Sequence, residues 1–396
     1  MADFLPFLIF LMILAVFLQA GPALTVFYMI IGTFLLGFWW QKRALKHLKV
    51  SREFIDHAYL GETIQIKLTV ENASLLPILW LEAHESLPVN LRAGRDIKEV
   101  FSLGVRGKKT IQYEINAFKR GYYPIGPLTL ESGDPLGLTK PSQISIPESP
   151  LTIYPRIVDL AALGFPSRSP FGTIRAENPI YEDPTRLMGK RNFQNGDSVR
   201  RIDWKSSAAS GELLVKLYEA SIALELALLL DLDKRSYPIE NYYDATELAV
   251  TAAASLAAWA KQRQQSVGLF TNGLDPLAEE ALSPALPPRK GAGHLVSLLE
   301  LLARVQPGEQ QAVDPWLQNT RGALSWGTTL VFISGQVAPE TFDQLFQAQK
   351  AGLNPIILLT GKLFHLQEIR RTAAGYHLPL YTAASTADIS AIGGAK

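Results

Sequence analysis

The sequence predicts an α/β protein built from an N-terminal transmembrane hairpin of two helices, a small β-sandwich and a doubly wound α/β domain. Three observations lead to this prediction. Two apolar runs open the chain, stretches of alternating polar and apolar residues follow, and the last part alternates strand-like with helical patterns. A chain of 396 residues is also longer than one ordinary domain. We expect parts at 1–49, 50–157, 158–189 and 190–396.

The N-terminal segment carries the predicted hairpin. Phe4–Ala20 and Ala23–Trp40 are free of charged residues, and Gly21-Pro22 separates them. Each run is about 17 or 18 residues long, close to the minimum that crosses a hydrocarbon core. Basic residues follow directly, at Lys42, Arg43, Lys46 and Lys49. By the positive-inside rule this end faces the cytoplasm.

These features predict a multi-pass protein of the inner (cytoplasmic) membrane, with the lipid bilayer as a partner and the bulk of the chain in the cytoplasm. A signal peptide followed by a single anchor is the alternative. A signal peptide needs a basic start, whereas Asp3 is the charged side chain that precedes Phe4. Both versions leave everything after residue 41 in the cytoplasm.

Composition argues against several classes of function. The net charge is +1, so the chain lacks the basic excess of nucleic-acid-binding proteins, and we expect no nucleic-acid partner. Without cysteine there is neither a disulfide nor a thiolate metal site. The sequence holds no G-x-x-x-x-G-K-[ST] for nucleotide phosphates and no G-x-S-x-G after a strand. We therefore expect no enzymatic activity and no cofactor.

Two folded parts are expected behind the membrane hairpin. TIQIKLTVEN, from Thr63 to Asn72, alternates polar with apolar residues and predicts a half-buried strand; similar runs up to about residue 157 predict an antiparallel sandwich. A Pro-, Gly- and Ser-rich linker covers 158–189. Beyond residue 212, buried-strand patterns such as ALELALLLD alternate with helical stretches such as 244–265, which predicts a doubly wound sheet.

The segment 190–220 carries the strongest local signal. Asn195-Gly196 predicts a turn, and Asp197 is a plausible N-cap for a short helix that ends near Trp204. Its charged residues are basic at Lys190, Arg191, Arg200, Arg201 and Lys205, and acidic at Asp197 and Asp203. One interpretation is a partner- or anion-binding surface around Trp204. The other is an internal ion-pair network that seats the segment, with Trp204 in the core.

An ordered set of motifs in this chain resembles the bacterial domain of unknown function 58 family. The main motif is Arg191-x-Phe193-x-x-Gly196-Asp197-x-x-Arg200-x-Ile202-x-Trp204-Lys205, followed by Leu214-Val215-Lys216. Three further motifs precede it, namely Lys119-Arg120-Gly121-Tyr122 with Ile125-Gly126-Pro127, Asp134–Leu138, and Ile153–Arg156. One departure follows Ala208, where the family commonly has Ala-Arg and this chain has Ala209-Ser210.

The resemblance implies a von Willebrand A-like C-terminal domain and two N-terminal membrane helices. It also implies a MoxR-type AAA+ ATPase as partner, and a transglutaminase-like membrane protein as a further one. It supplies no catalytic residue. The basic charge around Trp204 suggests Arg191, Arg200, Arg201, Trp204 and Lys205 for partner binding, and the motif has Gly196, Asp197 and Asp203 as structural signature residues. Of these, we expect Asp197 and Trp204 to be chiefly structural, and Arg201 and Lys205 to be exposed and binding.

A von Willebrand A domain that binds Mg²⁺ has Asp-x-Ser-x-Ser after its first strand. Here the strand ends at Asp231, and Asp233 and Arg235 stand where the serines would be. A guanidinium at a ligand position opposes a divalent cation and could pair with Asp231 instead. We therefore expect a degenerate site at Asp231 and Asp233 that binds no metal.

These observations favour a membrane-anchored, non-enzymatic adaptor or assembly factor, chaperone-like in action, that works with a cytoplasmic MoxR-type AAA+ ATPase. Two alternatives remain. One is a metal-dependent protein-binding module of the von Willebrand A type, and the other is an unrecognised enzyme.

Overall fold

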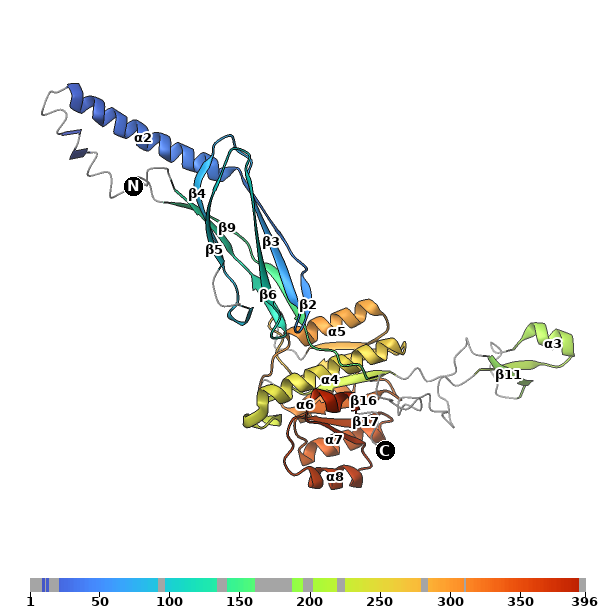
Figure 1. Ribbon diagram of the computed structural model, residues 1–396. Coiled ribbons are helices and arrows are strands. Elements are labelled where there is room, and N and C mark those ends of the chain that lie inside the picture. Colours follow the sequence, from blue (N-terminus) through green and yellow to red (C-terminus); the bar gives the residue numbers. More distant parts are fainter. Residues whose placement is uncertain are drawn as a thin grey trace. The chain divides into compact units, whose positions relative to one another are not determined.

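The chain forms two compact units, Met1–Tyr154 and Pro155–Lys396, in a computed structural model (Figure 1). Within them the structure describes residues 9–10, 12–13, 21–91, 97–133, 141–160, 187–194, 202–218, 225–278, 284–309 and 311–391. The mixed α/β class agrees with the prediction. Each unit is described by itself.

The first unit begins with a long helix, α2 (Gly21–Lys46). Pro22 suits this start, because proline in the first turn loses no helical hydrogen bond. The C-terminal end of α2 packs on the strands that follow. The indole Nε1 of Trp40 donates to Pro77 O at 3.0 Å, and Leu45 is buried in the sandwich core.

The predicted transmembrane hairpin is wrong for the part of the chain that can be described. None of its helices is both long and apolar enough to cross a membrane. The prediction treated Trp40 as a membrane boundary and residues 41–49 as a juxtamembrane segment. Instead, α2 continues through Lys42 and Arg43 to Lys46. The multi-pass localisation in the inner membrane is corrected with it, and most of Phe4–Ala20 lies outside the described residues.

The described strands of the first unit form three sheets. Their orders are β1-β3-β6, β2-β10-β7 and β5-β4-β8-β9. Their bounds are β1 Leu48–Glu53, β2 His57–Tyr59, β3 Thr63–Asn72, β4 Ile78–Glu85, β5 Ile97–Leu103, β6 Lys108–Asn116, β7 Gly121–Ile125, β8 Leu128–Ser132, β9 Ser142–Ile146 and β10 Ser149–Tyr154, with a 3₁₀ turn at Val89–Leu91. Alternate residues of β3 and β4 face two apolar clusters, one around Leu81 and the other around Ile66.

A buried ion pair joins these sheets. Arg52 on β1 lies 2.5 Å from Glu85 on β4, and the Glu85 side chain is fully buried. The hydroxyl of Tyr113 on β6 donates to the same carboxylate, and burial together with this bond raises the pKa of Tyr113. Arg52 Nη1 also donates to Ser149 Oγ at 2.8 Å, at the start of β10. We call Arg52, Glu85 and Tyr113 the Glu85 cluster; with Ser149 it connects all three sheets.

At two positions of the upstream motifs, close contacts explain why the residue is glycine. A Cβ on Gly121 would lie 2.8 Å from the Tyr123 ring, whose hydroxyl donates to Lys119 O at 3.0 Å. Gly126 has φ +111°, and a Cβ there would lie 3.0 Å from Arg52 Nη2. Gly121 therefore leaves room for Tyr123, and Gly126 leaves room for Arg52 of the Glu85 cluster. The motif at 134–138 lies outside the described residues.

The second unit contains a six-stranded sheet of order β15-β14-β13-β16-β17-β18. Its strands are β13 Leu226–Leu230, β14 Val267–Thr271, β15 Ala285–Arg289, β16 Thr329–Ser334, β17 Asn354–Thr360 and β18 Leu380–Ala383. All neighbours pair in parallel except β14 and β15. The continuous burial of β13, β16 and β17 reflects a sheet that is covered on both faces.

Helices pack on both faces of this sheet (Figure 1). They are α4 Tyr242–Gln262, α5 Ala292–Arg304, α6 Val313–Arg321, α7 Pro339–Lys350, α8 Leu366–Gly375 and α9 Thr386–Ala391, with 3₁₀ turns at Lys234–Ser236 and Ile239–Asn241. α4 packs with α5, while α6, α7 and α8 cover Ala227 and Leu229 of β13 from the other face. Eight of the 21 residues of α4 are alanine, and these small side chains let the helix lie close to the sheet.

The segment before the six-stranded sheet forms a small structure of its own. β11 (Leu187–Asn192) pairs antiparallel with β12 (Leu214–Tyr218) in a separate two-stranded sheet, and α3 (Trp204–Ser210) lies between them in sequence. We call the described parts of 187–218 the signature module.

Candidate functional site

Polar side chains meet where three neighbouring parallel strands end. Asp231 follows β13, Asn272 follows β14, and Ser334 is the last residue of β16. The strand order reverses between β13 and β16, since the chain first builds outward to β14 and then crosses to the other side. In doubly wound sheets, ligands bind at the carboxyl ends of the strands at this reversal. This edge is therefore the first place to look for chemistry.

Asp231 is the centre of a closed hydrogen-bond network. Its Oδ1 accepts from Asn272 Nδ2 at 2.8 Å and from the Asp233 backbone N–H at 2.9 Å, and its Oδ2 lies 2.7 Å from Ser334 Oγ. The side chain is fully buried, and burial raises the pKa of Asp231. Hydrogen bonds from Ser236, Asn272, the Asp233 backbone and Ser334 act in the opposite direction.

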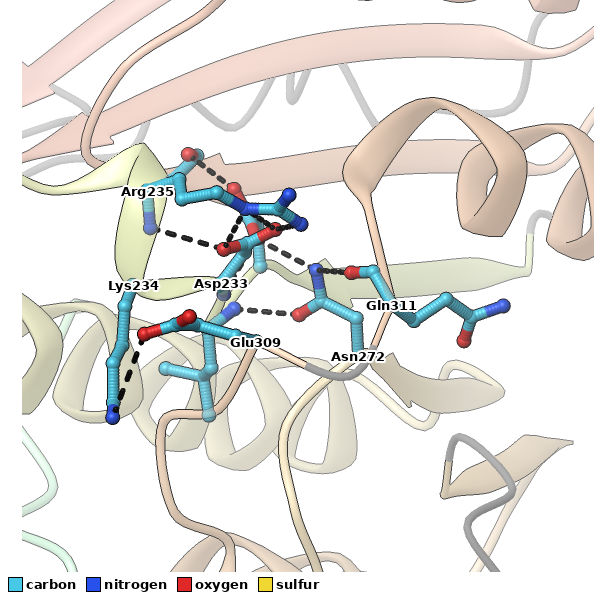
Figure 2. A network of polar contacts seen from close by, with 9 residues as sticks. Asp233, Lys234, Arg235, Asn272, Glu309 and Gln311 are labelled. Atoms are coloured by element: carbon cyan, nitrogen blue, oxygen red, sulfur yellow. Dashed lines mark hydrogen bonds and ion pairs between the residues drawn. The ribbon is translucent and has the colours of Figure 1, made fainter.

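The surrounding residues seal this network. Asn272 Oδ1 accepts from Leu232 N at 2.7 Å (Figure 2), and the hydroxyl of Tyr237 donates to Asp231 O at 2.6 Å. Burial raises the pKa of Tyr237 well above its ordinary value. A Cβ on Gly335 would overlap the Tyr237 ring, so glycine is required for this close approach. The network leaves little room for a ligand at Asp231.

Arg235 pairs with Asp233 and not with Asp231, which corrects the predicted pairing. Its Nε and Nη2 lie 2.9 and 2.6 Å from the two carboxylate oxygens of Asp233 (Figure 2). Arg235 follows Asp233 by two residues in a 3₁₀ turn that Asp233 caps, so its side chain reaches back to that residue. Beside this pair, Lys234 Nζ lies 3.8 Å from Glu309 Oε1.

The chemistry available at this edge is limited. Among the described residues, no three His, Cys, Asp or Glu side chains are grouped so that they could hold a metal ion. Both oxygens of Asp233 face a guanidinium. The Ser334 hydroxyl lies beside a carboxylate, as a nucleophile would, but Ser334 and Asp231 are both fully buried. A substrate therefore has no access to this hydroxyl.

The signature module is held together by Asp203. The Asp203 Oδ1 accepts from Ser206 N at 3.2 Å, and this bond caps the N-terminus of α3. Lys190 Nζ from β11 lies 2.8 Å from Asp203 Oδ2. The bond from Lys190, with the Ser206 N–H, lowers the pKa of Asp203. Gly211, in the left-handed conformation at φ 73°, ends the helix.

The predicted site residues of this module have mixed positions. Trp204 is the first residue of α3 and is 63% exposed, so the expectation that it lies in a core is wrong. Lys205 is exposed, and Arg191 donates to the backbone oxygen of Asn192 at 3.1 Å. Asp203 is the N-cap of α3, whereas Asp197 and most of the helix predicted to follow it lie outside the described residues.

Four predicted residues lie outside the described residues, namely Gly196, Asp197, Arg200 and Arg201. The structure also gives Asn272 a role in the network of Asp231. From the sequence, Thr271-Asn272-Gly273 is mainly a turn, with an anion cradle as the alternative. The position of Asn272 directly after a buried strand, like that of Asp231, is the signal that could have found it.

Comparison with known proteins identifies relatives of the chain. Residues 189–354 match the family described as "Protein of unknown function DUF58". The chain is 23% identical over 326 residues to YeaD of Bacillus subtilis strain 168, an uncharacterized protein, covering 80% of this chain and 76% of YeaD.

Two solved structures share only limited similarity with the chain. The CARDB domain of PF1109 from Pyrococcus furiosus is 11% identical, covering 27% of this chain and 94% of that domain, with a TM-score of 0.19. Proximal thread matrix protein 1 of the mussel byssus is 14% identical, covering 43% of this chain and 46% of that protein, with a TM-score of 0.29. The family match over residues 189–354 and the similarity to YeaD confirm the resemblance to this family seen in the sequence.

Proposed function

We propose that this protein is a non-enzymatic adaptor or assembly factor that works with a MoxR-type AAA+ ATPase, and that the signature module is its docking surface. The observation that carries the proposal is the exposed indole of Trp204 on α3. Tryptophan at a solvent-facing position is a frequent anchor of protein interfaces. Lys205, the next residue, is exposed as well and adds positive charge.

The construction of α3 supports a binding role. The helix has only seven residues, yet it is fastened at both ends by Asp203 and Gly211. Such fastening holds the Trp204 ring in place before a partner arrives, and a preorganised anchor loses less conformational entropy on binding. The described module is also basic, with Lys190, Arg191, Lys205 and Lys216 against Asp203 and Glu212.

The closed network of Asp231 supports the non-enzymatic part of the proposal. Its oxygens accept hydrogen bonds from within the protein, and the neighbouring Ser334 is buried. The strand order of the sheet supports a von Willebrand A-like domain as the finer description. Numbered along the chain the order is 3-2-1-4-5-6, with the third strand antiparallel. The metal-dependent alternative is less well supported, because the Asp233 carboxylate already forms an ion pair with Arg235 and is not available to a metal ion.

The test is binding of the full chain to the purified MoxR-type ATPase of the same organism, measured by calorimetry. Trp204→Ala should weaken binding by at least about 30-fold, as expected of a hot spot worth about 2 kcal/mol. It should lower the free energy of unfolding by less than about 1 kcal/mol, since the ring is exposed. In a core the same change would cost about 3–5 kcal/mol.

Trp326→Ala is the matched control, because Trp326 is 51% exposed in a different part of the second unit. It should bind the ATPase like the wild type. Arg201→Glu with Lys205→Glu should abolish binding while the protein remains folded. The proposal is refuted if the wild-type chain fails to bind, or if Trp204→Ala binds normally.

A further inference from the structure

A second surface at the carboxyl edge of the six-stranded sheet exposes large apolar side chains. Ile239 is 96% exposed, Tyr243 70% and Phe364 54%. Ile239 and Tyr243 lie where the chain leaves β13 and enters α4, and Phe364 lies between β17 and α8. We call these three residues the edge patch.

The two segments that carry the edge patch are fastened to each other. With its amide oriented to satisfy both groups, Asn241 accepts from Lys362 N at 2.8 Å and donates to Pro238 O at 3.2 Å. A Cβ on Gly361 would lie 2.6 Å from the Cβ of Ala245, so the β17–α8 segment runs close to the start of α4. The edge patch is therefore formed before any partner arrives.

The edge patch contributes little to the stability of its own unit. An isoleucine as exposed as Ile239 buries almost no apolar surface, and so gains almost nothing from the hydrophobic effect. Single exposed apolar residues are common, but three of them on contacting segments are not scattered. Clustered exposure of this kind marks a surface that another molecule covers.

The charges around the edge patch indicate the kind of partner. Glu240 and Asp244, on either side of the Tyr242-Tyr243 pair, are exposed, and neither forms an ion pair within the described residues. Lys362 on the facing segment balances one of them. Asp244 lies in the first turn of α4 and stabilises the helix through its interaction with the helix dipole. Its negative charge nevertheless remains exposed at the surface.

The nearby basic groups do not change this balance. Arg235 pairs with Asp233, and Lys234 lies close to Glu309, so these four charges cancel. The edge patch thus keeps an acidic excess beside apolar side chains.

We propose that the edge patch binds a short segment of a partner protein that combines apolar side chains with lysine or arginine. The apolar side chains would cover Ile239 and Phe364. The basic side chains would lie against Glu240 and Asp244. This surface differs from the signature module and does not depend on the ATPase.

The probe is a fluorescein-labelled peptide in which leucine and lysine are separated by serine, with binding to the full chain followed by fluorescence polarisation. Its counterpart carries glutamate in place of lysine. The wild-type protein should bind the lysine peptide at least about tenfold more tightly than the glutamate peptide, a difference of about 1.4 kcal/mol. Ile239→Ser with Phe364→Ser should weaken binding of the lysine peptide by about tenfold.

Two controls separate this surface from general adhesion. Val296→Ser removes an exposed apolar side chain from α5 and should leave binding within about twofold of the wild type. Glu240→Gln with Asp244→Asn keeps the shape of the surface and should abolish the preference for lysine. The proposal is overturned if the wild-type protein does not distinguish the two peptides, or if Val296→Ser weakens binding as much as the edge-patch variant.

Discussion

Each unit of this protein buries a carboxylate completely, and the two are stabilised in different ways. Glu85 in the first unit lies against the guanidinium of Arg52 at 2.5 Å and also accepts from Tyr113. Asp231 in the second unit accepts from an amide, a backbone N–H and hydroxyl groups. The nearest guanidinium to Asp231 in sequence, that of Arg235, is bound to Asp233 instead.

The difference follows from where each carboxylate lies. Glu85, the last residue of β4, lies between sheets, and its partners are side chains from other strands, Arg52 on β1 and Tyr113 on β6. Asp231 sits at the end of parallel strands, where successive loops deliver polar groups to one point. A cation stabilises Glu85 at the cost of a second buried charge. Neutral donors stabilise Asp231 without that cost, but they leave its charge uncompensated.

The largest expected effect is that of Glu85→Ala. It leaves the buried Arg52 guanidinium without its carboxylate, and should lower the free energy of unfolding of the first unit by about 3–5 kcal/mol. Urea titration of the full chain, followed by hydrogen exchange and mass spectrometry, reports each unit separately. The double variant Arg52→Met, Glu85→Leu should lose less than Glu85→Ala alone. A loss below about 1 kcal/mol for Glu85→Ala would show that the pair is not a stabilising one.

The next effect is that of Asp231→Ala, which should cost the second unit about 2–4 kcal/mol. The change leaves buried donors of Asn272, Ser334 and the Asp233 backbone without an acceptor, and each unsatisfied group costs about 1–3 kcal/mol. Asp231→Asn keeps one acceptor oxygen and should cost less. If the two variants are equally damaged, the hydrogen bonds are not what stabilises this edge.

Asp231 should also make the stability of the second unit depend on pH. Burial raises its pKa above the ordinary value of 3.8. The folded protein then holds this proton more tightly than the unfolded chain does. The free energy of unfolding should therefore fall as pH rises from about 4 through the raised pKa. Asp231→Asn should flatten this part of the profile, measured as urea midpoints from pH 4 to 8; parallel profiles for both proteins would contradict the expectation.

A smaller effect is expected for Tyr113→Phe, about 1.5–2 kcal/mol, because a hydrogen bond to a charged acceptor is lost while Arg52 still neutralises Glu85. Tyr123→Phe in the same unit is the matched control. Its hydroxyl donates to a neutral carbonyl, so it should cost about 1 kcal/mol. Equal losses would mean that the charge of Glu85 does not strengthen the bond.

The smallest expected effect is that of magnesium. Millimolar Mg²⁺ should leave the melting temperature of the wild-type protein unchanged, because Arg235 holds Asp233 and neutral donors surround Asp231. A real site would add about 2.7 kcal/mol at a hundredfold excess over its dissociation constant. A rise of several degrees that Asp231→Ala abolishes would overturn this prediction.

Much of the second unit could be predicted from the sequence, because apolar residues are spaced clearly and differently in its strands and in its helices. The runs that contain β13, β16 and β17 are continuously apolar, as buried parallel strands must be. β15 gave no such signal, since its ALPPR sequence contains two prolines and lies at an edge. The prediction of a transmembrane hairpin relied on hydropathy alone. It could not foresee that Trp40 and Leu45 pack on the sandwich.

The two buried carboxylates were predictable to different degrees. Asp231 follows an apolar strand directly, which points to the carboxyl edge of a sheet. Its partners Asn272 and Ser334 come from segments distant in sequence, which the pattern does not connect. The pairing of Arg235 with Asp231 was wrong for a local reason, because the turn at Lys234–Ser236 brings the Arg235 side chain back to Asp233. Glu85 was missed although a signal exists. It falls in the same phase of β4 as the buried Leu81 and Ala83, where a carboxylate must find a partner.

The prolines of β15 have a consequence for the protein in concentrated solution. Pro287 and Pro288 lack backbone N–H groups, and Gly268 on β14 lets Pro288 approach closely. β15 is the outermost strand on its side of the six-stranded sheet, and its pairing with β14 is irregular. An incoming strand from another molecule would find few donors there. This border therefore resists intermolecular β-pairing, and hence aggregation.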